Sequence, residues 1–82
     1  MSTLEIDVGD LRAAAVEFTE TDLVVTLRDG RKIATPLEWY PRLQRASTRE
    51  RDNFEIMPMG VHWPEIDEDL SIAGMLKGRR GV

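Results

Sequence analysis

The side chains most capable of chemistry are gathered in one short stretch of this 82-residue chain. It contains the only histidine, His62, followed by the carboxylates Glu65, Asp67, Glu68 and Asp69. A histidine beside carboxylates suits general acid–base catalysis, and clustered carboxylates suit a hard cation such as Ca²⁺. Each of these chemistries competes with a purely structural role for the same residues.

The spacing favours the structural role. One histidine cannot form a multi-histidine metal site, and a nucleophile–base pair needs a serine or a second base nearby. Ser47 and Ser71 instead occupy positions typical of helix N-caps. The acidic residues lack the odd-position spacing and central glycine of a calcium loop. We therefore predict a non-enzymatic protein with no catalytic residue, no metal and no cofactor, in which His62 forms structural hydrogen bonds.

The acidic run has a simpler interpretation as a solvated loop that leads into the last helix. Asp67 or Asp69 would then lie near the N-terminus of that helix, where the helix dipole favours negative charge. Trp39, Tyr40 and Trp63 are interpreted mainly as core residues, although aromatic side chains also anchor interfaces.

Composition and charge exclude several classes of protein. The chain has no cysteine, so disulfides and thiolate metal sites are excluded. The first five residues do not resemble a signal peptide, and no apolar run approaches the roughly 20 residues that cross a bilayer. These features predict a cytoplasmic protein that does not bind membranes.

The net charge of −4 disfavours direct nucleic-acid binding. The charge is unevenly spread, because residues 28–51 hold seven basic and three acidic residues, whereas residues 52–69 hold six acidic residues and no basic one. Direct DNA binding could come only from the basic stretch. The arginines at 42, 45 and 49 would share a helical face only in a continuous helix, which a cap at Ser47 argues against.

The strand pattern begins with a three-stranded antiparallel meander over residues 13–35. Leu23, Val25 and Leu27 alternate with polar or smaller residues, so they should share one face of a strand. Asp29-Gly30 then fits a type I′ hairpin turn, which needs positive φ angles. A further short strand over residues 4–8 is also consistent with alternation.

Helices should follow the meander and be short. A helical turn is expected over residues 37–40, and a helix from Pro41 to about Arg45 because proline is tolerated in a first turn. Ser47 and Glu50 form a capping box for a second helix over residues 48–53.

The remaining pattern is one of short strands and a last helix. Residues 54–57 and 61–63 should be strands, separated by a turn at Pro58-Met59-Gly60. Ser71 should cap a helix that ends at Gly78, and residues 79–82 should form a flexible tail. The sequence therefore predicts one α+β domain with its core over residues 13–78, in which two or three short helices cover one face of an antiparallel sheet.

An ordered set of residues carries a family resemblance. The set is the turn Asp29-Gly30, then Trp39 and Pro41, then Gly60-Val61-His62-Trp63-Pro64, then Asp67-Glu68-Asp69-Leu70-Ser71. With these blocks in order over residues 13–78, the chain resembles the bacterial and phage-associated family called domain of unknown function 2442. The resemblance implies an α+β fold and a non-enzymatic accessory role, in some cases beside a second small protein in toxin–antitoxin pairs.

The expected function is protein binding as the antitoxin-like half of a small two-gene system, with a basic partner. The candidate contact residues are Glu65, Asp67, Glu68, Asp69, Trp63 and Met59. Met57-Pro58-Met59 replaces the more polar turn that the family resemblance implies, which could mark an adapted contact surface. The alternative is a phage-type acidic inhibitor, similar to an anti-CRISPR protein, that blocks a nucleic-acid-binding defence complex.

Overall fold

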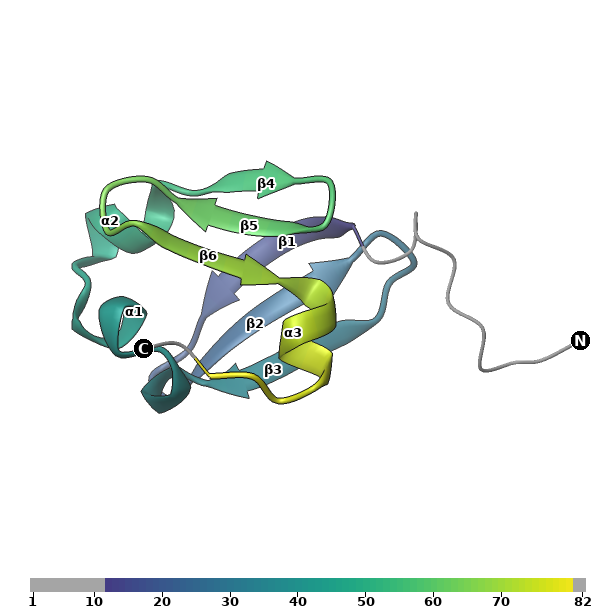
Figure 1. The fold of residues 1–82 in the computed structure, drawn as a ribbon, viewed down its shortest axis with the longest axis horizontal. Coiled ribbons are helices and arrows are strands. Elements are labelled where there is room, and N and C mark those ends of the chain that lie inside the picture. The colour runs from purple at the N-terminus through teal and green to yellow at the C-terminus, as the bar shows by residue number, and fades with distance from the viewer. Residues whose placement is uncertain (1–11, 81–82) are drawn as a thin grey trace, which may run out of the picture.

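Two three-stranded antiparallel sheets and short helices build the protein (Figure 1). The computed structural model describes residues 12–80. Its elements, in order, are β1 (Ala13–Phe18), β2 (Asp22–Leu27), β3 (Lys32–Pro36), the 3₁₀ helix η2 (Leu37–Trp39), α1 (Pro41–Arg45), α2 (Thr48–Asp52), β4 (Glu55–Met57), β5 (Gly60–Trp63), β6 (Glu68–Ser71) and α3 (Ile72–Leu76). The predicted α+β class is confirmed, and the additional strands form a second sheet of their own. The strand expected over residues 4–8 lies outside the described residues.

The first sheet is the predicted meander, in the order β1-β2-β3. Leu23, Val25 and Leu27 are all buried on one face of β2, as their alternation predicts. Its hairpin turn differs from the predicted type I′, because Gly30 has a φ of 95° while Asp29 does not have a positive φ. The N–H of Gly30 donates to the oxygen of Leu27 at 2.9 Å, which gives a three-residue loop that needs only one left-handed residue.

Asp29 contributes to this turn through its side chain instead. Its carboxylate accepts hydrogen bonds from the backbone N–H of Arg31 at 3.0 Å and from the Nε of Arg31 at 2.6 Å. These bonds hold the pKa of Asp29 below its ordinary value. The Asp-Gly pair therefore predicts the position of the hairpin correctly, but the turn type differs from the predicted one.

The second sheet has the order β4-β5-β6 and contains an unpredicted strand. Residues 68–71 pair antiparallel with β5, with Trp63 opposite Glu68 and Val61 opposite Leu70. The prediction of a solvated acidic loop entering a helix is therefore wrong for this segment. Asp67 has a φ of 53° and lies in the turn that brings β6 back along β5. Pairing with β5 overrides the low strand propensity of glutamate and aspartate.

The helices follow their predicted caps closely. Ser47 Oγ accepts from the N–H of Glu50 at 3.1 Å, and the Glu50 carboxylate accepts from the N–H of Ser47 at 2.9 Å, so the capping box is present. The break before Ser47 separates α1 from α2, so the arginines do not form one continuous stripe. Ser71 caps α3 by accepting from the N–H of Gly74 at 2.9 Å.

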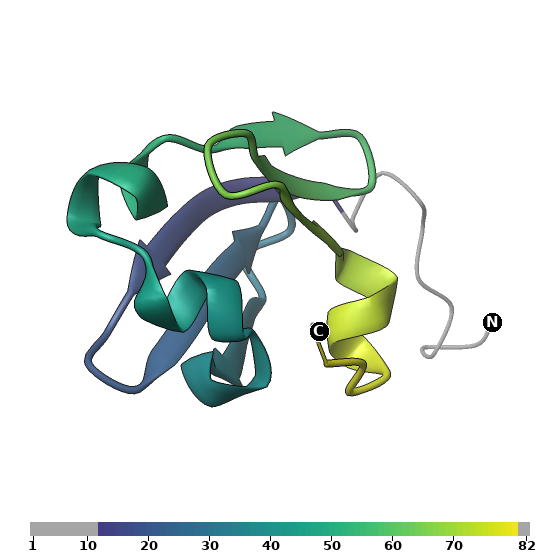
Figure 2. The ribbon, with the colours of Figure 1, turned by 60° about the vertical axis from the view of Figure 1, so that its left-hand side comes forward.

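The core lies between the two sheets and beneath the helices. Trp63, Tyr40, Leu23, Leu43 and Ile72 are its largest fully buried side chains. Figures 1 and 2 show α1 and α2 together at one end, where they connect the sheets, while α3 lies near β3. Within residues 12–80, no helix is long and apolar enough to cross a bilayer.

The chain after α3 packs back onto the protein. The N–H of Arg79 donates to the oxygen of Gly74 at 2.9 Å. The guanidinium of Arg80 lies 4.9 Å from the centre of the Trp39 ring, within reach of a cation–π contact. The first two residues of the segment expected as a flexible tail thus have defined contacts.

Candidate functional site

The Gly60–Pro64 signature is divided between the core and the outer face of β5. Trp63 is fully buried, and its indole N–H donates to the backbone oxygen of Arg51 at 3.0 Å. Gly60 leaves no room for a side chain, because a Cβ there would lie 2.1 Å from the oxygen of Leu70. This block therefore sets the packing of the second sheet, as the structural interpretation predicts.

His62 lies on the opposite face of β5 from Trp63. Its Nδ1 is 3.1 Å from the Asp69 carboxylate on β6, and Glu55 stands directly opposite it on β4. The Asp69 side chain is 80% exposed, so this contact is open to solvent. In the part of the chain that the structure describes, no group of three or more histidine, cysteine, aspartate or glutamate residues could hold a metal ion.

The acidic run does not form one surface. Glu65 pairs with the Nη1 of Arg49 at 2.9 Å and accepts from the amide of Asn53 at 2.9 Å. Asp67 is exposed, and its backbone oxygen accepts a hydrogen bond from Arg42 at 2.6 Å. Asp67 and the largely exposed side chain of Asp69 remain accessible to a partner, and Met59 is 46% exposed nearby.

Glu68 and Trp63, two of the expected contact residues, are in the core. Burial raises the pKa of the Glu68 carboxyl, and the backbone N–H of Asp69 and the charge of Arg42 offset part of that rise. Its Oε2 has no hydrogen-bond partner among the described residues. Neither side chain can contact a partner that binds the folded surface. The reason is their register, since both sit on the inward face of paired strands.

The same buried region contains Tyr40 and Thr35. Burial raises the pKa of the Tyr40 hydroxyl, and the charge of Glu68 adds to the rise. The hydroxyl oxygens of Tyr40 and Thr35 are also buried without a hydrogen-bond partner among the described residues. This buried polar group belongs to the core rather than to an exposed site.

Several arginines of the basic stretch serve the fold. Arg51 donates from Nε to the oxygen of Leu43 and from Nη2 to the oxygen of Gln44, both at 2.9 Å. Its guanidinium also lies 5.2 Å from the centre of the Phe18 ring. Arg51 therefore ties α2 to the end of α1 and to β1, which leaves its charge committed to internal contacts.

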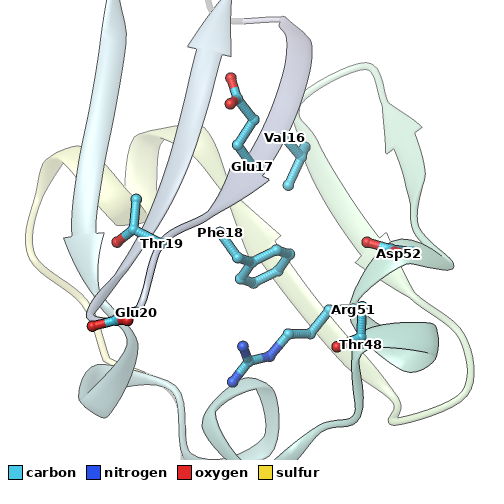
Figure 3. Close-up of a pocket in the computed structure, with 8 residues that line it drawn as sticks. All are labelled: Val16, Glu17, Phe18, Thr19, Glu20, Thr48, Arg51 and Asp52. Atoms are coloured by element: carbon cyan, nitrogen blue, oxygen red, sulfur yellow. The ribbon is translucent and has the colours of Figure 1, made fainter.

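A groove with a volume of about 750 Å³ lies between β1 and α2 (Figure 3). One wall consists of residues 16–20, from β1 and the turn after it. The other wall consists of Thr48, Arg51 and Asp52 from α2. We refer to this hollow as the β1–α2 groove.

The groove is bordered by negative charge. Glu17, Glu20 and Asp52 are exposed, and none of them forms an ion pair within residues 12–80. Figure 3 shows the Phe18 ring and the Arg51 side chain between the two walls. Arg51 keeps its positive charge while it donates to carbonyl oxygens, so the three carboxylates and this one guanidinium give the groove lining a net negative charge.

A second exposed feature is apolar. Met57 and Met59 flank the turn between β4 and β5 and are 45% and 46% exposed. With Leu70 they line a shallow hollow of about 260 Å³. Methionine side chains adapt readily to different partners, so this turn remains a candidate contact.

Comparison with known proteins places these features in a family. The family model described as "Protein of unknown function (DUF2442)" matches residues 13–81. The chain belongs to this family. The match spans every strand and helix from β1 to α3, including both walls of the groove.

Two solved structures of uncharacterised function have the same fold. A protein of unknown function from Rhodospirillum rubrum is 31% identical, with a TM-score of 0.71, and the alignment covers 87% of this chain and 90% of that one. An uncharacterised protein from Chromobacterium violaceum, studied by NMR, is 27% identical with a TM-score of 0.73, covering 87% of this chain and 69% of that one. No curated protein matches the chain.

Sequence reasoning did not identify the groove. Glu17 and Glu20 are separated from Asp52 by more than thirty positions, and their approach depends on how α2 packs beside β1. The signal available in the sequence was the alternation of β1, which places Glu17 on an exposed face. In this DUF2442 chain the β1–α2 groove thus lies apart from the most distinctive sequence motif.

Proposed function

We propose that this DUF2442 protein is a non-enzymatic, cytoplasmic protein-binding module and the antitoxin-like member of a small two-gene system. Its partner is a basic protein that binds at the β1–α2 groove. The observation that carries the proposal is the grouping of Glu17, Glu20 and Asp52, exposed and without ion pairs among the described residues, around a large hollow. Concave sites with exposed charge favour a ligand of the opposite sign.

The contacts of the neighbouring arginines also favour a basic partner. Arg42 donates to the oxygen of Asp67, Arg49 pairs with Glu65, and Arg51 binds two backbone oxygens. Each of these arginines thus has an acceptor within the protein, whereas the three groove carboxylates are exposed and form no ion pair among residues 12–80. A basic partner would be attracted at long range, so the acidic rim would mainly raise the association rate.

Association kinetics of two matched variants test the location of the site. One variant carries Glu17→Gln, Glu20→Gln and Asp52→Asn in the groove. The other carries Glu65→Gln, Asp67→Asn and Asp69→Asn on the surface expected from the sequence. Both remove three negative charges, so their net charges are equal, and Glu68 is left unchanged because it is buried.

The partner is obtained by capture from the native host at moderate salt and is then purified for surface plasmon resonance. The groove variant is expected to slow association about tenfold and to reduce its salt dependence, while the second variant changes it less. If the second variant has the larger effect, the partner binds at residues 65–69 instead. If neither variant alters association, acidic recognition is wrong.

The antitoxin role is tested separately, by a growth assay. Expression of the captured partner alone should arrest growth, and co-expression of this chain should restore it. If the partner is instead a nucleic-acid-binding complex, and this chain competes with nucleic acid for it, the chain is an acidic inhibitor and the antitoxin proposal is wrong.

A further inference from the structure

The inner wall of the groove is the edge of a sheet. β1 pairs with β2, and within residues 12–80 it lies at the end of the strand order β1-β2-β3. An edge strand presents backbone N–H and C=O groups that another chain can pair with. The groove is thus bordered by a potential template for strand addition.

The lining residues indicate that the groove runs along this edge. Successive side chains of a strand point to opposite faces, so a hollow over one face would be lined by every second residue. In the β1–α2 groove, the three consecutive β1 residues 16–18 all line the hollow, and residues 19 and 20 of the following turn extend the lining. A continuous run of this kind is expected when the hollow borders the backbone edge itself.

We propose that the β1–α2 groove receives an extended, basic segment of the partner, which adds as a further strand to the edge of β1. The inference rests on the proposed function and specifies its mode of recognition. β1 contributes residues 16–18 to this edge, so the segment that pairs with it has about three residues, roughly 10 Å of extended chain. Backbone hydrogen bonds would supply affinity, and side chains would supply selectivity.

The chemistry of the walls selects the sequence of that segment. Val16 and Phe18 are half-buried apolar residues on β1, whereas Glu17, Glu20 and Asp52 are exposed carboxylates. An alternating segment places its basic side chains on one face and its apolar side chains on the other. Lysine or arginine at every second position, with small apolar residues between them, fits both requirements.

A peptide titration tests strand addition directly. The probe is the acetylated and amidated peptide Lys-Val-Lys-Thr-Lys-Val-Lys, added to the isotopically labelled full chain and followed by NMR. The first control is the same peptide N-methylated at its five central amides, which keeps every charge and removes the five central backbone donors. The second control replaces each lysine with glutamate.

The expected result is that the first peptide shifts the amide signals of residues 16–20 and of α2 and slows hydrogen exchange in β1. The N-methylated peptide should bind at least tenfold more weakly, and the glutamate peptide should not bind. Equal binding of the methylated peptide, shifts confined to other residues, or no binding at all would overturn strand addition. The proposed function is tested separately, since the groove variant would still slow association of the whole partner.

Discussion

The indole Nε1 of Trp63 lies 3.0 Å from the backbone oxygen of Arg51 and donates a hydrogen bond to it. The bond joins β5 to the end of α2 inside the core, where Trp63 is fully buried. The Phe18 ring meets Trp63 edge-on, with ring centroids 6.2 Å apart. A residue that looked like part of an active-site motif therefore connects both sheets and a helix.

Replacing Trp63 with phenylalanine should destabilise the fold by about 2 kcal/mol. The variant loses part of a fully buried ring and leaves the backbone oxygen of Arg51 without its donor. Urea unfolding followed by circular dichroism measures the change. Trp39→Phe is the matched control, since Trp39 is only partly buried, and it should cost less than half as much. Equal costs would show that the Trp63 hydrogen bond contributes little.

The parts of the fold that depend on local chemistry were predictable. The alternation of Leu23, Val25 and Leu27 and the capping box at Ser47 involve neighbours within a few positions, and both are observed. Strand β6 was not predictable in this way, because Glu68 and Asp69 become strand residues only through pairing with β5. The groove depends on packing between β1 and α2, which no local pattern encodes.

Two glycine-to-alanine substitutions distinguish the cost of a steric clash from the cost of an unfavourable backbone conformation. In Gly60→Ala, the new Cβ would lie 2.1 Å from the oxygen of Leu70, so β5 and β6 must move apart. A loss of about 3 kcal/mol or more is expected. In Gly30→Ala, nothing lies within 4 Å of the Cβ, but φ is 95°, which predicts a cost of about 1–2 kcal/mol. A smaller loss for Gly60→Ala, read by thermal unfolding, would contradict the close approach.

Arg51→Lys should cost about 2 kcal/mol, because one ammonium group cannot reproduce the two directed bonds to the oxygens of Leu43 and Gln44. Arg49→Lys is the matched control. The Arg49 side chain is 78% exposed and pairs at the surface with Glu65, so about 0.5 kcal/mol or less is expected. Chemical denaturation of both variants measures the difference. Similar values would mean that Arg51 does not hold α2 to α1.

The last prediction concerns the pH dependence of stability at Glu68. Burial raises the pKa of this carboxyl in the folded state, so between its ordinary and raised pKa the folded chain binds more protons than the unfolded chain. The contribution of Glu68 to stability therefore falls as pH rises through that window and stays lower above it. Glu68→Gln removes this loss, because a neutral amide avoids burying a charge.

The variant should match the wild type in acid, where Glu68 is protonated, and should be more stable at neutral pH by on the order of 1 kcal/mol. Urea unfolding at several pH values measures the difference between the two proteins. Glu38→Gln is the control, since it makes the same substitution at an exposed position. The opposite result would be a variant that loses stability relative to the wild type as the pH rises from acid to neutral. In that case the ionised carboxylate stabilises the folded state, and folding lowers the pKa of Glu68 instead of raising it.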